Sequence, residues 1–156
     1  MTTRTSFGVT LIAIFMVAFG SAQDSENTIQ RSELPPAVQK TVDQQSAGAT
    51  VRGFSKEREK GKIFYEVELM VNGHSKDILM DSSGAVAEVE EEVAFDLLPA
   101  TVKSGLQAKA GHGKIVTVES ITKRDKLVAY EAKVATNGKK SEVQVGPNGQ
   151  PLSHEE

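Results

Sequence analysis

The stretch YEVELMVNG at residues 65–73 has a counterpart, YEAKVATNG, at residues 130–138. In the first stretch, apolar residues alternate with polar ones from Ile63 to Val71, which is typical of a half-buried strand. Both stretches end in Asn-Gly, which favours a two-residue hairpin turn because both turn positions need positive φ. Each stretch therefore predicts a strand, a tight turn and an antiparallel return strand.

A two-residue loop also fixes which residues face each other across the hairpin. The predicted cross-strand pairs are Val67–Ile78, Tyr65–Met80, Ala132–Val143 and Tyr130–Val145. Every one of these pairs is apolar, so the register is self-consistent, with one buried side in each hairpin.

An apolar stripe precedes each hairpin region. Leu34, Val38 and Val42 recur every four residues, and so do Leu98, Val102 and Leu106. This spacing places apolar side chains along one face of a helix. Pro35 and Pro99 fall in the first turn, where a missing N–H costs little. The sequence therefore predicts one helix ahead of each group of strands.

The matches recur at a nearly fixed offset, which indicates a repeat. We therefore predict an α+β fold made by tandem duplication, each unit being one helix packed on an antiparallel meander of three to four strands. The predicted units span residues 33–92 and 93–156. Residues 23–32 are polar and predict a flexible lead-in. The acidic segment 88–95 is expected to be a short linker between units that pack together.

The N-terminus has the pattern of a secretory signal peptide over residues 1–22. Arg4 precedes an apolar run from Val9 to Phe19, and small residues follow up to Ala22. The run is shorter than the roughly 20 residues that a membrane-spanning helix needs. We expect cleavage after Ala22, no stable membrane anchor after cleavage, and a periplasmic or secreted protein.

The chain also resembles a known family. The Leu-Pro helix start, Tyr-Glu-Val at 65–67, Asn-Gly at 72–73 and Asp-Ser-Ser-Gly at 81–84 resemble the PepSY-like domain. More closely, residues 33–152 resemble exported tandem proteins described as β-lactamase-inhibitor-like. The resemblance implies two tandem helix-plus-sheet units with an outer sheet face available to a partner, and a link to peptidase regulation.

Charge and cysteine content exclude several kinds of partner and site. Without residues 1–22 the chain has 17 basic and 21 acidic residues. That balance argues against nucleic acid, which favours a basic surface. The chain has no cysteine, so neither disulfides nor thiolate metal sites are expected.

No catalytic signature emerges from the remaining residues. His74, His112 and His154 lack metal-ligand spacing. The loop that begins at Asp81 lacks the ligand and glycine that a calcium loop needs at its fifth and sixth positions. No glycine-rich phosphate loop or nucleophile elbow is present. We therefore expect no enzyme activity, no metal and no cofactor.

One surface is a candidate partner-binding site. If residues 59–61 form a three-residue hairpin loop, the sheet face away from the first helix carries both apolar and charged side chains. The candidate residues are Arg52, Phe54, Phe64, Glu66, Glu68, Met70, Asp77 and Leu79. The apolar members either pack internally, against the other half or the linker, or bind a protein or peptide. In the binding hypothesis, Phe54 and Met70 are the anchors.

The sequence thus favours an exported, non-enzymatic binding module that inhibits or regulates an envelope peptidase or another protein. Two alternatives stay open. One is a small-molecule or cation sensor that uses the Glu68–Asp77 pair, and the other is a structural envelope protein with no discrete site. The partner itself is not identified by the sequence.

Overall fold

The computed structural model describes residues 25–59 and 61–156. The predicted signal peptide, residues 1–22, lies outside the described residues. The strands are β1 (Ser25–Thr28), β2 (Thr50–Glu59), β3 (Lys62–Val71), β4 (His74–Asp81), β5 (Val86–Glu92), β6 (Lys114–Lys123), β7 (Lys126–Thr136) and β8 (Lys139–Val145). The helices are α1 (Pro36–Gln45) and α2 (Ala100–Ala110), and the short 3-10 helices are η1 (Arg31–Glu33) and η2 (Phe95–Leu97).

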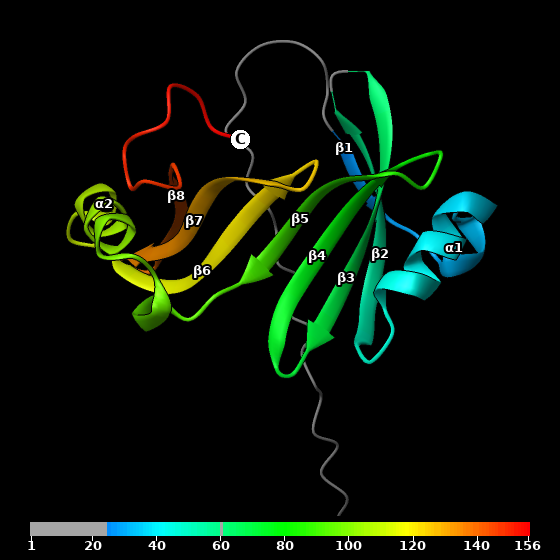
Figure 1. Ribbon diagram of the computed structural model, residues 1–156, viewed down its shortest axis with the longest axis horizontal. Helices are drawn as coiled ribbons and strands as arrows, with labels where there is room; N and C mark the ends of the chain where they lie inside the picture. Colours follow the sequence, from blue (N-terminus) through cyan, green and yellow to red (C-terminus); the bar gives the residue numbers. More distant parts are fainter. Residues whose placement is uncertain (1–24, 60) are drawn as a thin grey trace, which may run out of the picture.

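All the strands belong to one antiparallel sheet in which each strand pairs with its neighbours in the chain, from β1 to β8 (Figure 1). The predicted fold class, a tandem duplication of helix-plus-meander units, is therefore wrong. The protein is mostly β, with two helices added to one continuous meander. The physical reason lies in residues 88–92, which were expected to be part of a linker. They form β5, which pairs with β4 on one side and β6 on the other.

The hairpin turns and their register were predicted correctly. Asn72 and Asn137 both have φ near +50°, and the glycine after each also has positive φ. All the predicted apolar pairs are present: Val67–Ile78, Tyr65–Met80, Ala132–Val143 and Tyr130–Val145. The short loops therefore set the register in both hairpins, as expected for loops of this length.

Both helices cover the same face of the sheet, called here the helix face. The register links Val67 to Ile78, Ile78 to Val89 and Val89 to Thr122 across the sheet. In Figure 1, α1 and α2 lie at opposite ends of the sheet. Each helix covers its own apolar cluster, one around Val38 and one around Val102.

The predicted register of β2 is wrong over most of its length. Glu59 pairs with Lys62, so the hairpin is one residue tighter than the expected three-residue loop. A bulge at Arg52 then restores the expected pairing of Val51 with Leu69. Between these points every side chain faces the side opposite to the predicted one. Phe54 is therefore opposite Val67 on the helix face, where it packs against the α1 cluster.

The start of the described chain also differs from the prediction. Residues 23–32 were expected to be flexible, but Ser25–Thr28 form β1, which pairs with β2. Polar composition concealed this strand because β1 is an edge strand with one neighbour. Among the described residues, no helix has both the length and the apolar character needed to cross a membrane.

Candidate binding face

The sheet face opposite the helices, called here the acid face, is rich in carboxylates. Alternation along the strands and the observed cross-strand pairs bring these residues to one side. The carboxylate residues of the acid face include Glu26, Glu57, Glu59, Glu66, Glu68, Asp77, Asp81, Glu88, Glu90, Glu92, Glu119, Glu131 and Glu142. Several face one another directly across strands, for example Glu68 opposite Asp77 and Asp77 opposite Glu90. Such like-charge pairs are destabilising when both members are ionised.

The structure places most of the predicted site residues on this face. The candidates that lie on this face are Phe64, Glu66, Glu68, Met70, Asp77 and Leu79. Arg52 lies at the β2 bulge and is exposed. Phe54, the predicted anchor, lies on the helix face. The first anchor of the binding hypothesis is therefore part of the core, because the true loop is one residue shorter than expected.

Three carboxylates converge where β1, β2 and β3 meet. Ligand atoms of Glu26, Glu57 and Glu66 all lie within 4.8 Å of one another. Glu66 is 9% exposed, and its Oε2 accepts a hydrogen bond of 2.8 Å from the hydroxyl of Ser55. The carboxyl groups of Glu57 and Glu66 lie side by side, so ionisation of one disfavours ionisation of the other. Carboxylate oxygens suit a hard cation. Ca²⁺ takes six to eight oxygen ligands, so these three carboxylates alone would not complete its coordination.

Burial shifts the titration of this cluster strongly. Loss of solvent raises the pKa of Glu66 to about 8, and the nearby carboxylate of Glu57 adds to the rise. Loss of solvent likewise raises the pKa of Glu57 to about 7, with Glu26 contributing. At neutral pH the cluster therefore carries less negative charge than its composition suggests.

The centre of the acid face behaves in the same way. Burial raises the pKa of Glu90 to about 9, and Glu131 and Glu88 add to the rise. Burial raises the pKa of Asp77 to about 7, and the carboxylates of Glu66 and Glu119 add to it. These acids lose their protons only above the usual pH range for carboxyl groups, because each is shielded from water and lies beside other acids.

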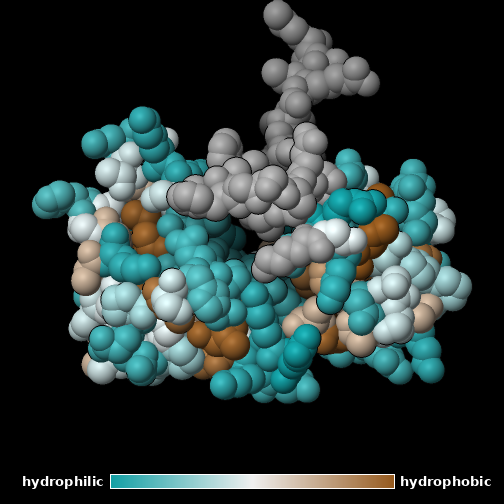
Figure 2. Space-filling view, turned by 90° about the horizontal axis from the view of Figure 1, so that it is seen from above, coloured by the Kyte–Doolittle hydropathy of each residue, from teal (hydrophilic) through white to brown (hydrophobic). Residues whose placement is uncertain are grey.

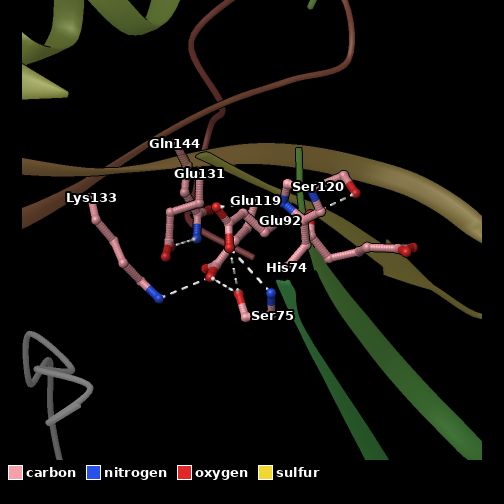
Figure 3. A network of polar contacts seen from close by, with 9 residues as sticks. His74, Ser75, Glu92, Glu119, Ser120, Glu131, Lys133 and Gln144 are labelled. Carbon is pink, nitrogen blue, oxygen red and sulfur yellow. Dashed lines mark hydrogen bonds and ion pairs between the residues drawn. The ribbon is translucent and has the colours of Figure 1, made fainter. Parts of the chain in front are cut away.

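Glu119 is the centre of a polar network between β4, β5, β6 and β7 (Figure 3). The ammonium group of Lys133 lies 3.0 Å from its Oε1. The hydroxyl of Ser75 lies 3.3 Å from the same oxygen and 3.4 Å from Oε2 of Glu92. The Ser75 backbone N–H donates to Glu92 at 3.1 Å. Glu119 is 3% exposed, and its second oxygen, Oε2, is buried without a hydrogen-bond partner among the residues that the structure describes.

Polar partners also surround the acids of β7 and β8. The side-chain amide of Gln144 donates to Oε2 of Glu131 at 2.7 Å (Figure 3). Its carbonyl oxygen accepts a hydrogen bond of 2.8 Å from the backbone N–H of Glu156. The carboxylate of Glu156 lies 3.6 Å from Lys123 Nζ. The C-terminal end of the chain is thereby held at the β6 and β8 end of the acid face.

Apolar surface is divided among small areas. In the side of the molecule that Figure 2 shows, hydrophobic atoms form several separate patches within a mostly hydrophilic surface. The large hydrophobic residues that are exposed in the described chain are Val51, Leu97 and Val116. Two hollows, of about 570 and 410 Å³, lie beside α2, and neither is lined by Glu66, Asp77 or Glu90. The distinguishing feature of the acid face is thus its charge.

Sequence reasoning missed the extent of this face. It placed Glu66, Glu68 and Asp77 correctly but assigned Glu88, Glu90 and Glu92 to a linker. The alternation of Glu88, Val89 and Glu90 is the strand pattern that could have revealed β5. Glu26 and Glu57 were missed because β1 and the β2 register were not foreseen.

Comparison with known proteins supports the fold and little beyond it. No family model and no curated protein matches the chain. A solved DUF2874 family protein from Bacteroides ovatus is similar, with a TM-score of 0.59 and 20% identity over 78% of this chain and 86% of that one.

Two further solved structures are similar. A BLIP-like protein from Bacteroides fragilis has a TM-score of 0.55 and 18% identity over 76% of this chain and 83% of that one. A protein from Bacteroides eggerthii, provisionally described as periplasmic, has a TM-score of 0.61 and 17% identity over 76% of this chain and 86% of that one. They agree with the predicted β-lactamase-inhibitor-like resemblance and with the periplasmic expectation, whereas the PepSY resemblance stays a prediction. At these identities, the likeness shows a shared fold.

Proposed function

We propose that the protein is an exported, non-enzymatic binding module that docks a protein partner on its acid face, and that it inhibits or regulates that partner. An envelope peptidase is one candidate partner. The observation that carries the proposal is the placement of the carboxylates. They occupy the one sheet face that the helices leave uncovered, and they destabilise that face more than a simple polar surface would.

Two other observations support the proposal. The exported, periplasmic setting is favoured by the signal-peptide pattern and by the provisional description of the Bacteroides eggerthii protein. The BLIP-like description belongs to the Bacteroides fragilis protein. For this chain it makes inhibition a reasonable form of the binding role to test.

Site-directed photo-crosslinking in the envelope of the source organism tests the docking face. A photoreactive amino acid at Met70 or Leu79 samples the acid face, and one at the exposed Gln44 of α1 is the control. We expect a discrete protein adduct from the acid-face positions and none from Gln44. Equal adducts from all three positions, or none from Met70 and Leu79, would contradict the proposal and favour a structural protein or a sensor of small ligands.

A further inference from the structure

The acid face has many more carboxyl groups than basic groups. Basic side chains that lie beside its carboxylates include Lys133, Lys123 and His74. A cation bound among these carboxyl groups favours their ionised form and would lower their raised pKa values. Neighbouring strands lie about 4.8 Å apart, so a row of side chains from β1 to β8 extends over roughly 30 Å. No single ion can contact carboxylates spread over that length. The arrangement suits an elongated partner with several positive charges.

Lys133 shows how this face holds a cation. Its ammonium lies 3.0 Å from Glu119, and the carboxylates of Glu90 and Glu142 also act on it. Burial alone lowers the pKa of Lys133, but the attraction of Glu119 and the hydrogen bond to it raise the pKa above the ordinary value. A partly buried ammonium is thus well accommodated here. Lysine side chains from another protein have the same chemistry.

Glu119 is an independent sign that the acid face can accept a further positive group. One carboxylate oxygen is bound by Lys133 and Ser75, whereas Oε2 is buried and has no hydrogen-bond partner within residues 25–59 and 61–156. An unsatisfied buried polar atom costs about 1–3 kcal/mol, and more if it is charged. A positive group that approaches this part of the face offsets that cost.

The acid face also has apolar side chains between its acids. Phe64, Met70 and Leu79 are half-buried on this face, and Leu79 lies between Glu66 and Glu88. A small polyamine has positive charges but offers these side chains only short methylene stems. A peptide segment that alternates basic and apolar side chains matches both kinds of surface.

We propose that the acid face binds an extended basic segment of the partner protein. Its lysine or arginine groups lie against the carboxylates around Glu119, Asp77 and Glu90, and its apolar side chains contact Met70 and Leu79. This inference rests on the proposed function and specifies the chemistry of the partner.

A defined peptide tests the inference. The probe is a fluorescent peptide of alternating lysine and leucine, titrated into the protein by fluorescence anisotropy. The same peptide with acetylated lysines keeps its length and apolar side chains but loses its charge. We expect saturable binding of the charged peptide that weakens as salt increases, and at least tenfold weaker binding of the acetylated peptide.

Matched variants place the peptide on the molecule. Glu68→Gln, Asp77→Asn and Glu90→Gln together remove three carboxyl groups from the acid face. Asp43→Asn, Asp96→Asn and Asp125→Asn remove three carboxyl groups from α1, η2 and a turn. We expect the first variant to weaken peptide binding at least tenfold and the second less than about twofold. Equal losses would mean general charge attraction, which overturns the inference.

Competition and crosslinking separate the remaining outcomes. Spermine or CaCl₂ that displaces the peptide at equal concentration would identify a small cation as the occupant and overturn the inference. Crosslinks from Met70 that persist in the Glu68/Asp77/Glu90 variant would preserve the docking face but reject a basic partner. If the unaltered protein neither forms the crosslinks nor binds the peptide, the proposed function is rejected as well.

Discussion

Ile78 and Leu79 are neighbours in β4, yet they belong to opposite environments. Ile78 is fully buried among apolar side chains under α1. Leu79 lies on the acid face between Glu66 and Glu88. The helix face lowers the free energy of the folded state by removing apolar surface from water. The acid face gathers buried carboxylates that raise it. The fold therefore depends mainly on the helix face.

A second contrast lies within the acid face. Around β6, β7 and β8, carboxylates have Lys133 and Gln144 as partners. Around β1, β2 and β3, Glu57 and Glu66 instead lie beside each other and beside Glu26. One end of the face thus provides basic and amide partners for its acids, whereas the acids at the other end lie beside other carboxyl groups.

The largest expected effect tests the contrast between Ile78 and Leu79. Ile78→Ala removes a fully buried side chain and should lower the free energy of unfolding by about 3 kcal/mol or more. Leu79→Ala should cost about 1 kcal/mol or less, since its side chain is already half-exposed. Urea denaturation of both variants provides the comparison. Similar losses would mean that the acid face is also structural core.

The next effect concerns how α2 approaches the sheet. Gly149 has φ +80°, and a Cβ atom there would meet the backbone oxygen of Thr101 in α2. Gly149→Ala should therefore cost about 2–3 kcal/mol through overpacking and backbone strain. Gly73 has φ +88° but no atom within 4 Å of such a Cβ. Gly73→Ala should cost about 1 kcal/mol from strain alone, and the difference between the two thermal shifts isolates the helix contact.

Removing a partner from the acid face should have an intermediate effect. Lys133→Met leaves the buried carboxylate of Glu119 without its cation and should cost about 2 kcal/mol. Arg31→Met breaks the exposed pair with Asp43 and should change stability by about 0.5 kcal/mol. Chemical denaturation near neutral pH measures both. If Lys133→Met leaves the free energy of unfolding unchanged, Glu119 takes up a proton in place of the ammonium group.

A gradual dependence of stability on pH is also expected. In the unfolded chain, Glu66 and Glu90 lose their protons around the ordinary value of 4.5, whereas in the folded protein their pKa values are about 8 and 9. The folded state therefore binds more protons between these limits, so stability falls as pH rises from about 5 to about 9.

Melting temperatures across that range, measured in buffers of equal ionic strength, check the pH prediction. The Glu90→Gln variant has no titratable group at this position, so its melting temperature should fall less as the pH rises. Asp43→Asn on α1 is the control and should leave it unchanged. Stability that instead rises with pH over this range would contradict the shifts assigned to the acid face.

Much of the architecture could be predicted because short-range signals determine it. Asn72-Gly73 and Asn137-Gly138 set two hairpins and their pairing. The four-residue apolar stripes set α1 and α2. Because side chains alternate along a strand, the correct hairpin register was enough to place Glu66, Glu68 and Asp77 on a common face.

The errors arose where two local irregularities compensate. The tight loop at Glu59–Lys62 and the bulge at Arg52 leave both ends of β2 compatible with either register, so Phe54 was assigned to the wrong face. The acidic β5 was hidden because its consecutive acids resemble a solvated linker, although Glu88 and Glu90 are partly buried on the acid face. No pattern within residues 86–92 alone shows that β4 and β6 are its neighbours. Because β5 was not predicted, the single continuous sheet was not predicted either.

The order of the strands has a kinetic consequence. Each strand pairs with the next one along the chain, from β1 to β8, so most pairings close short loops. Folding rates fall as the mean sequence separation of contacts increases. We therefore expect this β-rich protein to refold quickly for its class. Hairpins can form in sequence order as the chain becomes available, without waiting for its distant end.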